Sequence, residues 1–149
     1  MITYRAPRDN KVYFTVKEEI EIAKIICQVI VEKNYLVHAF AICMDHVHLL
    51  LECTGNELAN IVRTIKGKSA QSYKEILELP IGQPFHLWAQ KFNRWLIETD
   101  DQYRNTIHYI TYNRNKHNLS ENQELQRIVK SITQPVYDSK FTYHTNAKL

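Results

Sequence analysis

The sequence predicts an α+β fold in which an antiparallel sheet carries helices mainly on one face. Helical and strand segments are interspersed in the order β-α-β-β-α-β-α, a pattern that disfavours a purely parallel sheet. Two apolar runs, 35–43 and 46–53, are separated by only two residues, a spacing that suits antiparallel neighbours. The chain has 149 residues and only three glycines, which leaves little room for a linker. We therefore expect one domain over residues 1–134 and a polar C-terminal tail over 135–149.

The first elements are a short strand, a helix and a strand pair. Residues 1–5 are expected to form the short strand. Thr15 and Glu18 have the spacing of a capping box, which predicts a helix from there to about Lys33. One apolar stripe of this helix should pack on the sheet: Ile22, Ile25, Ile26, Val29 and Ile30. The second strand of the pair is apolar on both faces beyond His48, as is typical of a central strand.

A long amphipathic helix is expected next, from about residue 56 to 78. Its apolar or small side chains fall on one stripe: Leu58, Ile61, Val62, Ile65, Ser69, Ser72 and Ile76. Pro80, Gly82 and Pro84 end the helix. The segment 84–98, PFHLWAQKFNRWLIE, then supplies one long or two short strands.

Two further capping boxes predict the last helices. The run Thr99–Gln102 has the required spacing and two acidic residues that the helix dipole favours in a first turn. It predicts a helix over about 99–113. The run Ser120–Gln123 repeats the signal and predicts a final helix over about 120–132.

The composition is that of an ordinary globular domain, with 44% hydrophobic and 23% charged residues. The three cysteines are odd in number and lack CxxC spacing, which argues against a disulfide framework and favours a reducing, cytoplasmic setting. No apolar run approaches the roughly 20 residues of a membrane helix, so we expect no membrane partner. The net charge of +3 permits a nucleic-acid partner without requiring one.

The motif Asp45-His46-Val47-His48 is the sharpest local feature. Residues two apart on a strand point to the same face, so the imidazoles of His46 and His48 should lie side by side. Neutral imidazoles bind divalent transition metals and leave coordination positions open for a phosphate oxygen. The alternative is that both histidines are ordinary core or surface residues.

Tyr109 and Asn113 lie four residues apart and share one flank of the predicted helix 99–113. A tyrosine hydroxyl can attack phosphorus when a bound cation stabilises the phenolate and withdraws charge from the phosphate. Taken alone, a helical tyrosine beside an apolar stripe more often serves packing. Tyr112 is the nearest alternative nucleophile, but it faces about a quarter turn away from Asn113.

In combination, these segments resemble the single-tyrosine HUH transposases, where HUH denotes histidine, a bulky hydrophobic residue and histidine. The resemblance covers roughly residues 1–120 and includes His46-Val47-His48, the long basic helix and the tryptophan-containing segment 84–98. The arrangement Tyr109-Ile-x-x-Asn113 is more similar to the REP-associated tyrosine transposases than to the shorter insertion-sequence enzymes.

The resemblance implies a ferredoxin-like or RNA-recognition-like sheet with the HUH motif on a central strand. It implies an enzyme that cleaves and rejoins single-stranded DNA through a 5′-phosphotyrosine intermediate. Tyr109 would be the nucleophile, and His46, His48 and Asn113 would hold Mg²⁺ or Mn²⁺. The DNA partner would be hairpin or palindromic element ends. Relatives act as homodimers with the tyrosine helix supplied in trans or as monomers, and the sequence does not choose between them.

Two positions depart from the family pattern. The proline that often stands two residues before the first histidine is Met44 here, and the proline that often follows the asparagine is Arg114. Neither position supplies a ligand or the nucleophile, so the departures concern loop geometry.

Several cations could contact the DNA backbone, and Trp88, Trp95 or Tyr112 could stack on bases. The cations expected to bind DNA are Arg63, Lys66, Lys74, Arg94, Arg114 and Lys116. For any one of them, a solvated helix face is the alternative role.

Other functions remain open on sequence grounds. One is a domesticated HUH single-strand endonuclease that acts on repeat hairpins. Another is a noncatalytic module that binds single-stranded nucleic acid, although it would leave the histidine pair unexplained. A hydrolase of the histidine-triad kind is disfavoured because the third alternating position is Leu50.

Overall fold

The computed structural model describes residues 2–3, 13–135 and 144–146 of the chain, and its elements are mixed α and β as predicted. In chain order they are β1 (Ile2–Thr3), α1 (Val16–Glu32), β2 (Leu36–Cys43), β3 (His46–Glu52), α2 (Gly55–Ile76), β4 (Trp95–Ile97), α3 (Asp100–Thr111), α4 (Asn113–Lys116), α5 (Gln123–Ile132) and β5 (His144–Asn146). None of the helices in these described ranges combines the length and apolarity that a bilayer crossing demands.

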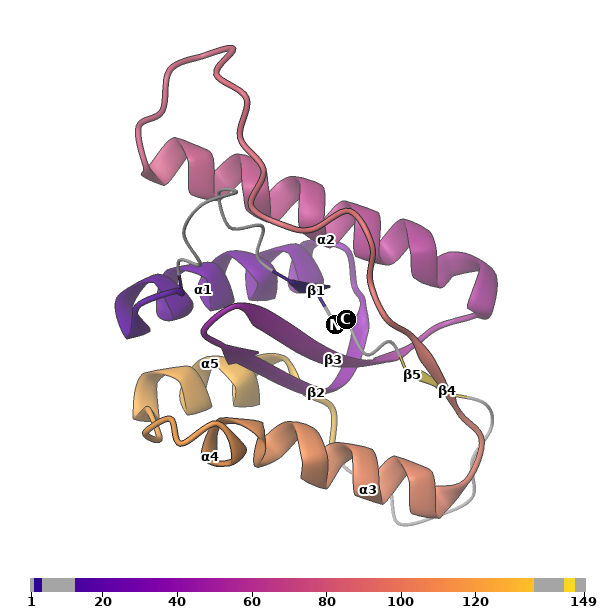
Figure 1. Cartoon of the computed structure of the whole chain (residues 1–149). Coiled ribbons are helices and arrows are strands. Elements are labelled where there is room, and N and C mark those ends of the chain that lie inside the picture. Colours follow the sequence, from indigo (N-terminus) through magenta and orange to yellow (C-terminus); the bar gives the residue numbers. More distant parts are fainter. Residues whose placement is uncertain (1, 4–12, 136–143, 147–149) are drawn as a thin grey trace.

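The main sheet has the strand order β1-β3-β2, so the strand that begins with His46 is central (Figure 1). β2 and β3 are antiparallel, with Leu36 opposite Glu52 and Cys43 opposite His46, which confirms the predicted strand pair. The turn between them contains Met44 in the left-handed region at φ 37°. Among the described residues, β4 pairs with β5 rather than with the main sheet, so the ferredoxin-like topology implied by the resemblance is not shown.

Helices cover both faces of the main sheet, and the prediction that they lie mainly on one face is wrong. Val47, Leu49 and Leu51 of β3 belong to a core shared with α1 and α2. Leu50, which points the other way, packs with Tyr103 and Ile110 of α3. Figure 1 shows α1 and α2 on one side of β2 and β3, with α3 and α4 on the other. The central strand is apolar on both faces because both faces are buried.

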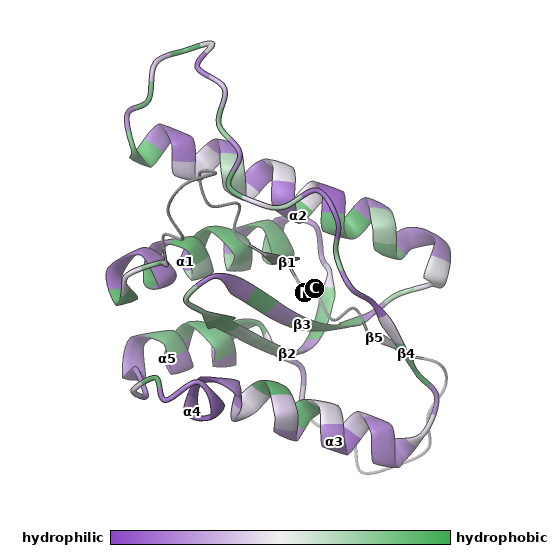
Figure 2. Cartoon of the chain, in the orientation of Figure 1, coloured by the Kyte–Doolittle hydropathy of each residue, from purple (hydrophilic) through white to green (hydrophobic). Residues whose placement is uncertain are grey.

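The helix α1 forms the apolar layer between the sheet and α2. Figure 2 shows much of α1 in green where it lies between these neighbours. Its predicted start is confirmed, because the Thr15 amide donates to the Glu18 carboxylate at 2.8 Å and the Glu18 amide donates back to the Thr15 hydroxyl at 3.3 Å. α5 packs against α1 and against β2, which is one of the two edge strands of the main sheet.

The segment 84–98 differs from its prediction. Only the short β4 within it forms a named strand, and the residues before β4 run along α2 in irregular conformation. The indole Nε1 of Trp88 donates to the Ser69 hydroxyl of α2 at 2.8 Å, and the Trp88 side chain is buried. The apolar residues of this segment therefore serve the packing of α2.

The start of α5 also differs from its prediction. The residue before the first turn is Asn122, whose side chain accepts a hydrogen bond from the Leu125 amide at 3.0 Å. Ser120 lies outside the helix and does not cap it. Of the expected N-terminal strand 1–5, only β1 is described, and of the expected tail 135–149, only Pro135 and β5 are described.

Candidate functional site

His46 and His48 lie side by side on the face of β3 that α3 covers. Both side chains are buried, and their ring centroids are 4.9 Å apart with the ring planes nearly perpendicular. This is the placement that alternation along a strand predicts. The intervening Val47 is fully buried in the core on the opposite face.

Tyr109 reaches this pair from α3. Its ring centroid lies 5.4 Å from that of His48, and its side chain is partly exposed. The helix is held to β2 through Tyr103, whose hydroxyl lies 2.9 Å from Nδ1 of the buried His38. Nε2 of His38 lies 2.9 Å from the Glu52 carboxylate. A carboxylate only accepts, so Nε2 carries the proton in the neutral ring and Tyr103 donates to Nδ1.

Asn113 lies beyond the end of α3 and begins α4. The helix expected over 99–113 ends at Thr111, and Tyr112 separates it from α4. Asn113 is fully buried, and its Oδ1 lies 3.3 Å from Nε2 of His46. The structure thus brings the four residues His46, His48, Tyr109 and Asn113 together on one side of the sheet.

The neighbouring Asp45 determines which ring nitrogen of His46 carries the proton. Nδ1 lies 2.8 Å from the Asp45 carboxylate, which accepts the ring proton. The neutral ring then presents a lone pair at Nε2, directed at the amide oxygen of Asn113. Two electron-pair donors facing each other at 3.3 Å suit a shared cation, and a carboxylate behind a histidine ligand is the common arrangement at metal sites.

The Asn113 amide has unusual surroundings. Its Oδ1 accepts a hydrogen bond from the Cys43 thiol at 3.0 Å, and burial raises the pKa of that thiol to about 12, which keeps it protonated. Among the described residues, the buried Nδ2 of Asn113 has no hydrogen-bond partner. A buried amide N–H without a partner costs free energy, so the hydrogen bonds of Asn113 alone do not explain its buried position.

The donor set consists of two imidazoles and one amide oxygen. Within the described part of the chain, no group of three or more histidine, cysteine, aspartate or glutamate side chains is placed to hold a metal. A cation at this site would therefore need the amide of Asn113 as its third protein ligand. Imidazole is a general ligand of divalent transition metals, carbonyl oxygen and water suit Mn²⁺ and Mg²⁺, and Mg²⁺ binds few protein groups while keeping several waters.

Two residues of the site were not identified as part of it by the sequence. His117 follows α4, and its ring centroid lies 5.2 Å from that of His46. Partial desolvation is the largest cause that lowers the pKa of His117, and the neighbouring charge of Lys116 lowers it further. The ammonium of Lys116, expected only as a DNA contact, lies 4.9 Å from the centroid of the Tyr109 ring. Both follow Asn113 by one turn of helix, which is the signal that could have found them.

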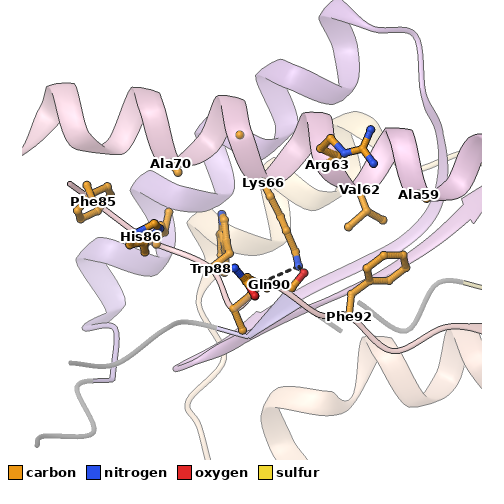
Figure 3. A pocket seen from close by; sticks show the side chains of 13 residues that line it. Ala59, Val62, Arg63, Lys66, Ala70, Phe85, His86, Trp88, Gln90 and Phe92 are labelled. Carbon is orange, nitrogen blue, oxygen red and sulfur yellow. Dashed lines mark hydrogen bonds between the residues drawn. The ribbon is translucent and has the colours of Figure 1, made fainter. Parts of the chain in front are cut away.

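Lys66 has a different partner from the DNA phosphate expected of it. Its ammonium donates to the carbonyls of Ala89, Gln90 and Lys91 at 2.8, 3.3 and 3.0 Å. Figure 3 shows its side chain reaching from α2 across to the segment that carries Gln90. Burial lowers the pKa of this ammonium. Lys66 therefore fastens the segment to α2.

Two more of the expected cations are engaged within the protein. Lys74 donates to the carbonyl of Gln83 at 2.7 Å. Arg114 donates to the buried carboxylate of Glu19 and to the carbonyl of Ile42, both at 2.9 Å. These contacts stabilise the fold. Together with Lys66, three of the six cations expected at DNA therefore have partners inside the protein.

The remaining expected cations are exposed. Arg63 lies on α2 at the groove shown in Figure 3, Arg94 precedes β4, and Lys116 lies beside Tyr109. Of the expected stacking residues, Trp95 and Tyr112 are about half exposed. A groove of about 320 Å³ joins Trp95 to Tyr109 and is lined on α3 by the polar side chains of Gln102, Asn105 and Thr106.

The model of the family described as "Transposase IS200 like" matches residues 4–113 of the chain, well over half of its length. The match spans the histidine pair, the tyrosine and the asparagine of the site. Comparisons with curated proteins and with solved structures found no match. Transposases of this kind are enzymes that act on DNA by cutting it. The chain therefore belongs to the IS200-like transposase family, and its membership implies a transposase-type DNA cleavage function.

Proposed function

We propose that the protein cleaves and rejoins single-stranded DNA with Tyr109 as the nucleophile and with the assistance of a divalent cation. The observation that carries the proposal is the meeting of two imidazoles, one amide oxygen and one phenol from distant parts of the chain. Packing alone would not require this set of polar groups on a largely buried face.

His46 Nε2, His48 and the amide oxygen of Asn113 would hold Mg²⁺ or Mn²⁺. When bound, such a cation polarises a phosphate oxygen and offsets the negative charge of the reacting group. Asp45 supports this set because its carboxylate keeps the ring proton of His46 on Nδ1.

Tyr109 performs the covalent step. Its phenol oxygen forms a bond to phosphorus as the bond from phosphorus to the 3′-oxygen breaks, which leaves a 5′-phosphotyrosine and a free 3′-hydroxyl. The phenol proton leaves Tyr109, and a proton is taken up by the departing 3′-oxygen. The ammonium of Lys116 lies 4.9 Å from the centroid of the Tyr109 ring, so it adds positive charge beside the proposed nucleophile. Reversal of the step reseals a strand without a nucleotide cofactor.

The DNA substrate is proposed to be the hairpin or palindromic ends of an element, presented as single strands. The groove between Tyr109 and Trp95 supports this substrate, because both apolar and polar side chains line it and an exposed indole at its end can stack on an unpaired base. Arg94, next to Trp95, and Lys116, beside Tyr109, supply positive charge for the flanking phosphates.

The test is covalent capture of a labelled single-stranded oligonucleotide in the presence of Mn²⁺. The wild-type chain should form an adduct that survives denaturing electrophoresis. Tyr109→Phe should form none while its affinity for the oligonucleotide stays within about threefold of wild type, since the lost hydroxyl is needed for chemistry and not for backbone contacts. Tyr112→Phe is the matched control, because Tyr112 is exposed, stacks on His108 and lies three residues further along.

Two other outcomes of the capture experiment would contradict the proposal. Capture that persists in Tyr109→Phe and disappears in Tyr112→Phe would move the nucleophile to Tyr112. Binding by the wild-type chain without capture under any metal condition would favour a noncatalytic single-strand binding module.

A further inference from the structure

One buried carboxylate connects the two ends of the candidate metal site. Glu19 of α1 is 1% exposed, and its two oxygens have different partners. Oε1 accepts the backbone N–H of Met44 at 2.7 Å, and Oε2 accepts Nη1 of Arg114 at 2.9 Å. Met44 precedes His46 by two residues, and Arg114 directly follows Asn113.

The connection depends on the identity of both partners. A proline at position 44 would have no N–H to donate, and a proline at position 114 would have no guanidinium. Both partners of Glu19 therefore use a hydrogen-bond donor that proline lacks.

Further contacts make the connection rigid. Nη1 of Arg114 also donates to the Ile42 carbonyl at 2.9 Å, and its Nε and Nη2 lie 3.3 Å from the Ser120 carbonyl. On the other side, the Met44 carbonyl accepts the Phe14 amide at 2.8 Å. The turn before His46 and the start of α4 are thus both tied to the N-terminal part of α1.

We propose that Glu19 and Arg114 are positioning residues that set the separation between His46 and Asn113 and so prepare the site for a divalent cation. Glu19 and Arg114 are not among the proposed ligands of the cation. The inference rests on the proposed function, because it takes His46, His48 and Asn113 as the ligands. Its physical basis is that a ligand on one element and a ligand on another bind a small cation well only when both are held close to their bound positions.

The experiment measures Mn²⁺ binding to the DNA-free chain by electron paramagnetic resonance of the free ion. The principal variant is Glu19→Leu with Arg114→Met, which removes the ion pair as a whole. Apolar side chains of similar size can replace a buried ion pair without loss of the fold, but the Met44 N–H and the Ile42 carbonyl lose their partners, so the thermal midpoint should fall while the chain stays folded. The dissociation constant for Mn²⁺ should nevertheless rise about 10- to 100-fold, as for other losses of support behind metal ligands.

A conservative variant tests the same point in a chain whose buried charge stays paired. Arg114→Lys can still reach Glu19 but lacks the planar guanidinium that also donates to Ile42. It should raise the Mn²⁺ dissociation constant by about tenfold or less, between the wild type and the double variant. Glu32→Gln is the matched control, because Glu32 also lies on α1 and pairs with Lys68 at the exposed surface. Its Mn²⁺ affinity should equal that of wild type.

The outcomes separate this inference from the proposed function. If the wild-type chain binds no Mn²⁺, the proposed metal site itself is wrong. If the wild-type chain binds Mn²⁺ and both the double variant and Arg114→Lys bind it equally well, the site stands and the positioning role of Glu19 and Arg114 is overturned.

Discussion

His46 is the side chain on which the proposed chemistry depends most, because each of its ring nitrogens has a different task. Nδ1 donates a hydrogen bond to the Asp45 carboxylate at 2.8 Å, and Nε2 faces the Asn113 amide oxygen at 3.3 Å. A change at either nitrogen would alter the electron pair offered to a cation. Asp45 contacts His46 directly, so we expect its carboxylate to influence the affinity of the proposed site for a cation.

Asp45→Asn tests the role of this carboxylate. A neutral amide accepts the Nδ1 proton less strongly and can favour the other tautomer of His46, so the affinity for Mn²⁺ should fall about tenfold. Titration of Mn²⁺ into the DNA-free chain measures this. Glu52→Gln is the control, since Glu52 supports the buried His38 in the same manner but away from the site. An Asp45→Asn chain with wild-type affinity would show that Asp45 does not tune the ligand.

The sequence predicts the residues of the site better than it predicts their partners. Strand alternation was enough to pair His46 with His48, because that relation is local. The contacts of Glu19, Lys66 and Arg114 come from elements far apart in the chain. Charge alone does not reveal whether a cation meets DNA or a carbonyl of its own protein. This is why three expected DNA contacts have partners inside the fold.

At the scale of single elements, the break between α3 and α4 shapes the site. α3 ends at Thr111, and Tyr112, with φ −94° and ψ 10°, joins it to α4. Asn113 then faces His46, while Lys116 and His117 reach Tyr109 and His46. The sequence predicted a single helix to about residue 113, and the structure divides it at Tyr112.

The start of α5 gives a clean test of helix capping. Asn122→Ala removes the side chain that accepts the Leu125 amide and should lower the free energy of unfolding by about 1 kcal/mol. Ser120→Ala should change it by less than about 0.5 kcal/mol, because only the backbone carbonyl of Ser120 is used, by Arg114. Urea denaturation followed by circular dichroism measures both. An equal loss of unfolding free energy in the two variants would indicate that Ser120 caps the helix, as the sequence predicted.

Strand and helix boundaries were predictable where a local signal and tertiary packing agree. The Thr15–Glu18 box begins α1 as expected, since nothing competes with it. The segment 84–98 has the apolar pattern of strands, but most of it packs on α2 through Trp88 and is fastened by Lys66. A side-chain pattern does not indicate which neighbour will satisfy the backbone.

At the scale of the whole molecule, the burial of both faces of β3 determines where the tyrosine lies. Both layers around the sheet belong to the same chain, and Tyr109 reaches His48 of its own chain at a ring separation of 5.4 Å. The expectation of helices on one face missed this arrangement because apolar residues on a central strand look alike whichever helix covers them.

A mixing experiment tests whether one chain is sufficient. Tyr109→Phe mixed with the His46→Ala/His48→Ala variant should form no more covalent adduct than either variant alone, because each chain lacks part of its own site. Exchange of the tyrosine helix between chains in a homodimer would instead restore capture in the mixture. A mixture of wild type with Tyr109→Phe serves as the control for dilution.

The most direct test of the central claim is anomalous diffraction from crystals of the wild-type chain soaked in Mn²⁺. The account predicts a manganese peak in contact with His46, His48 and the Asn113 amide oxygen, on the side of the sheet where Tyr109 lies. A peak bound elsewhere, or no peak at a concentration of Mn²⁺ that supports DNA cleavage, would contradict it.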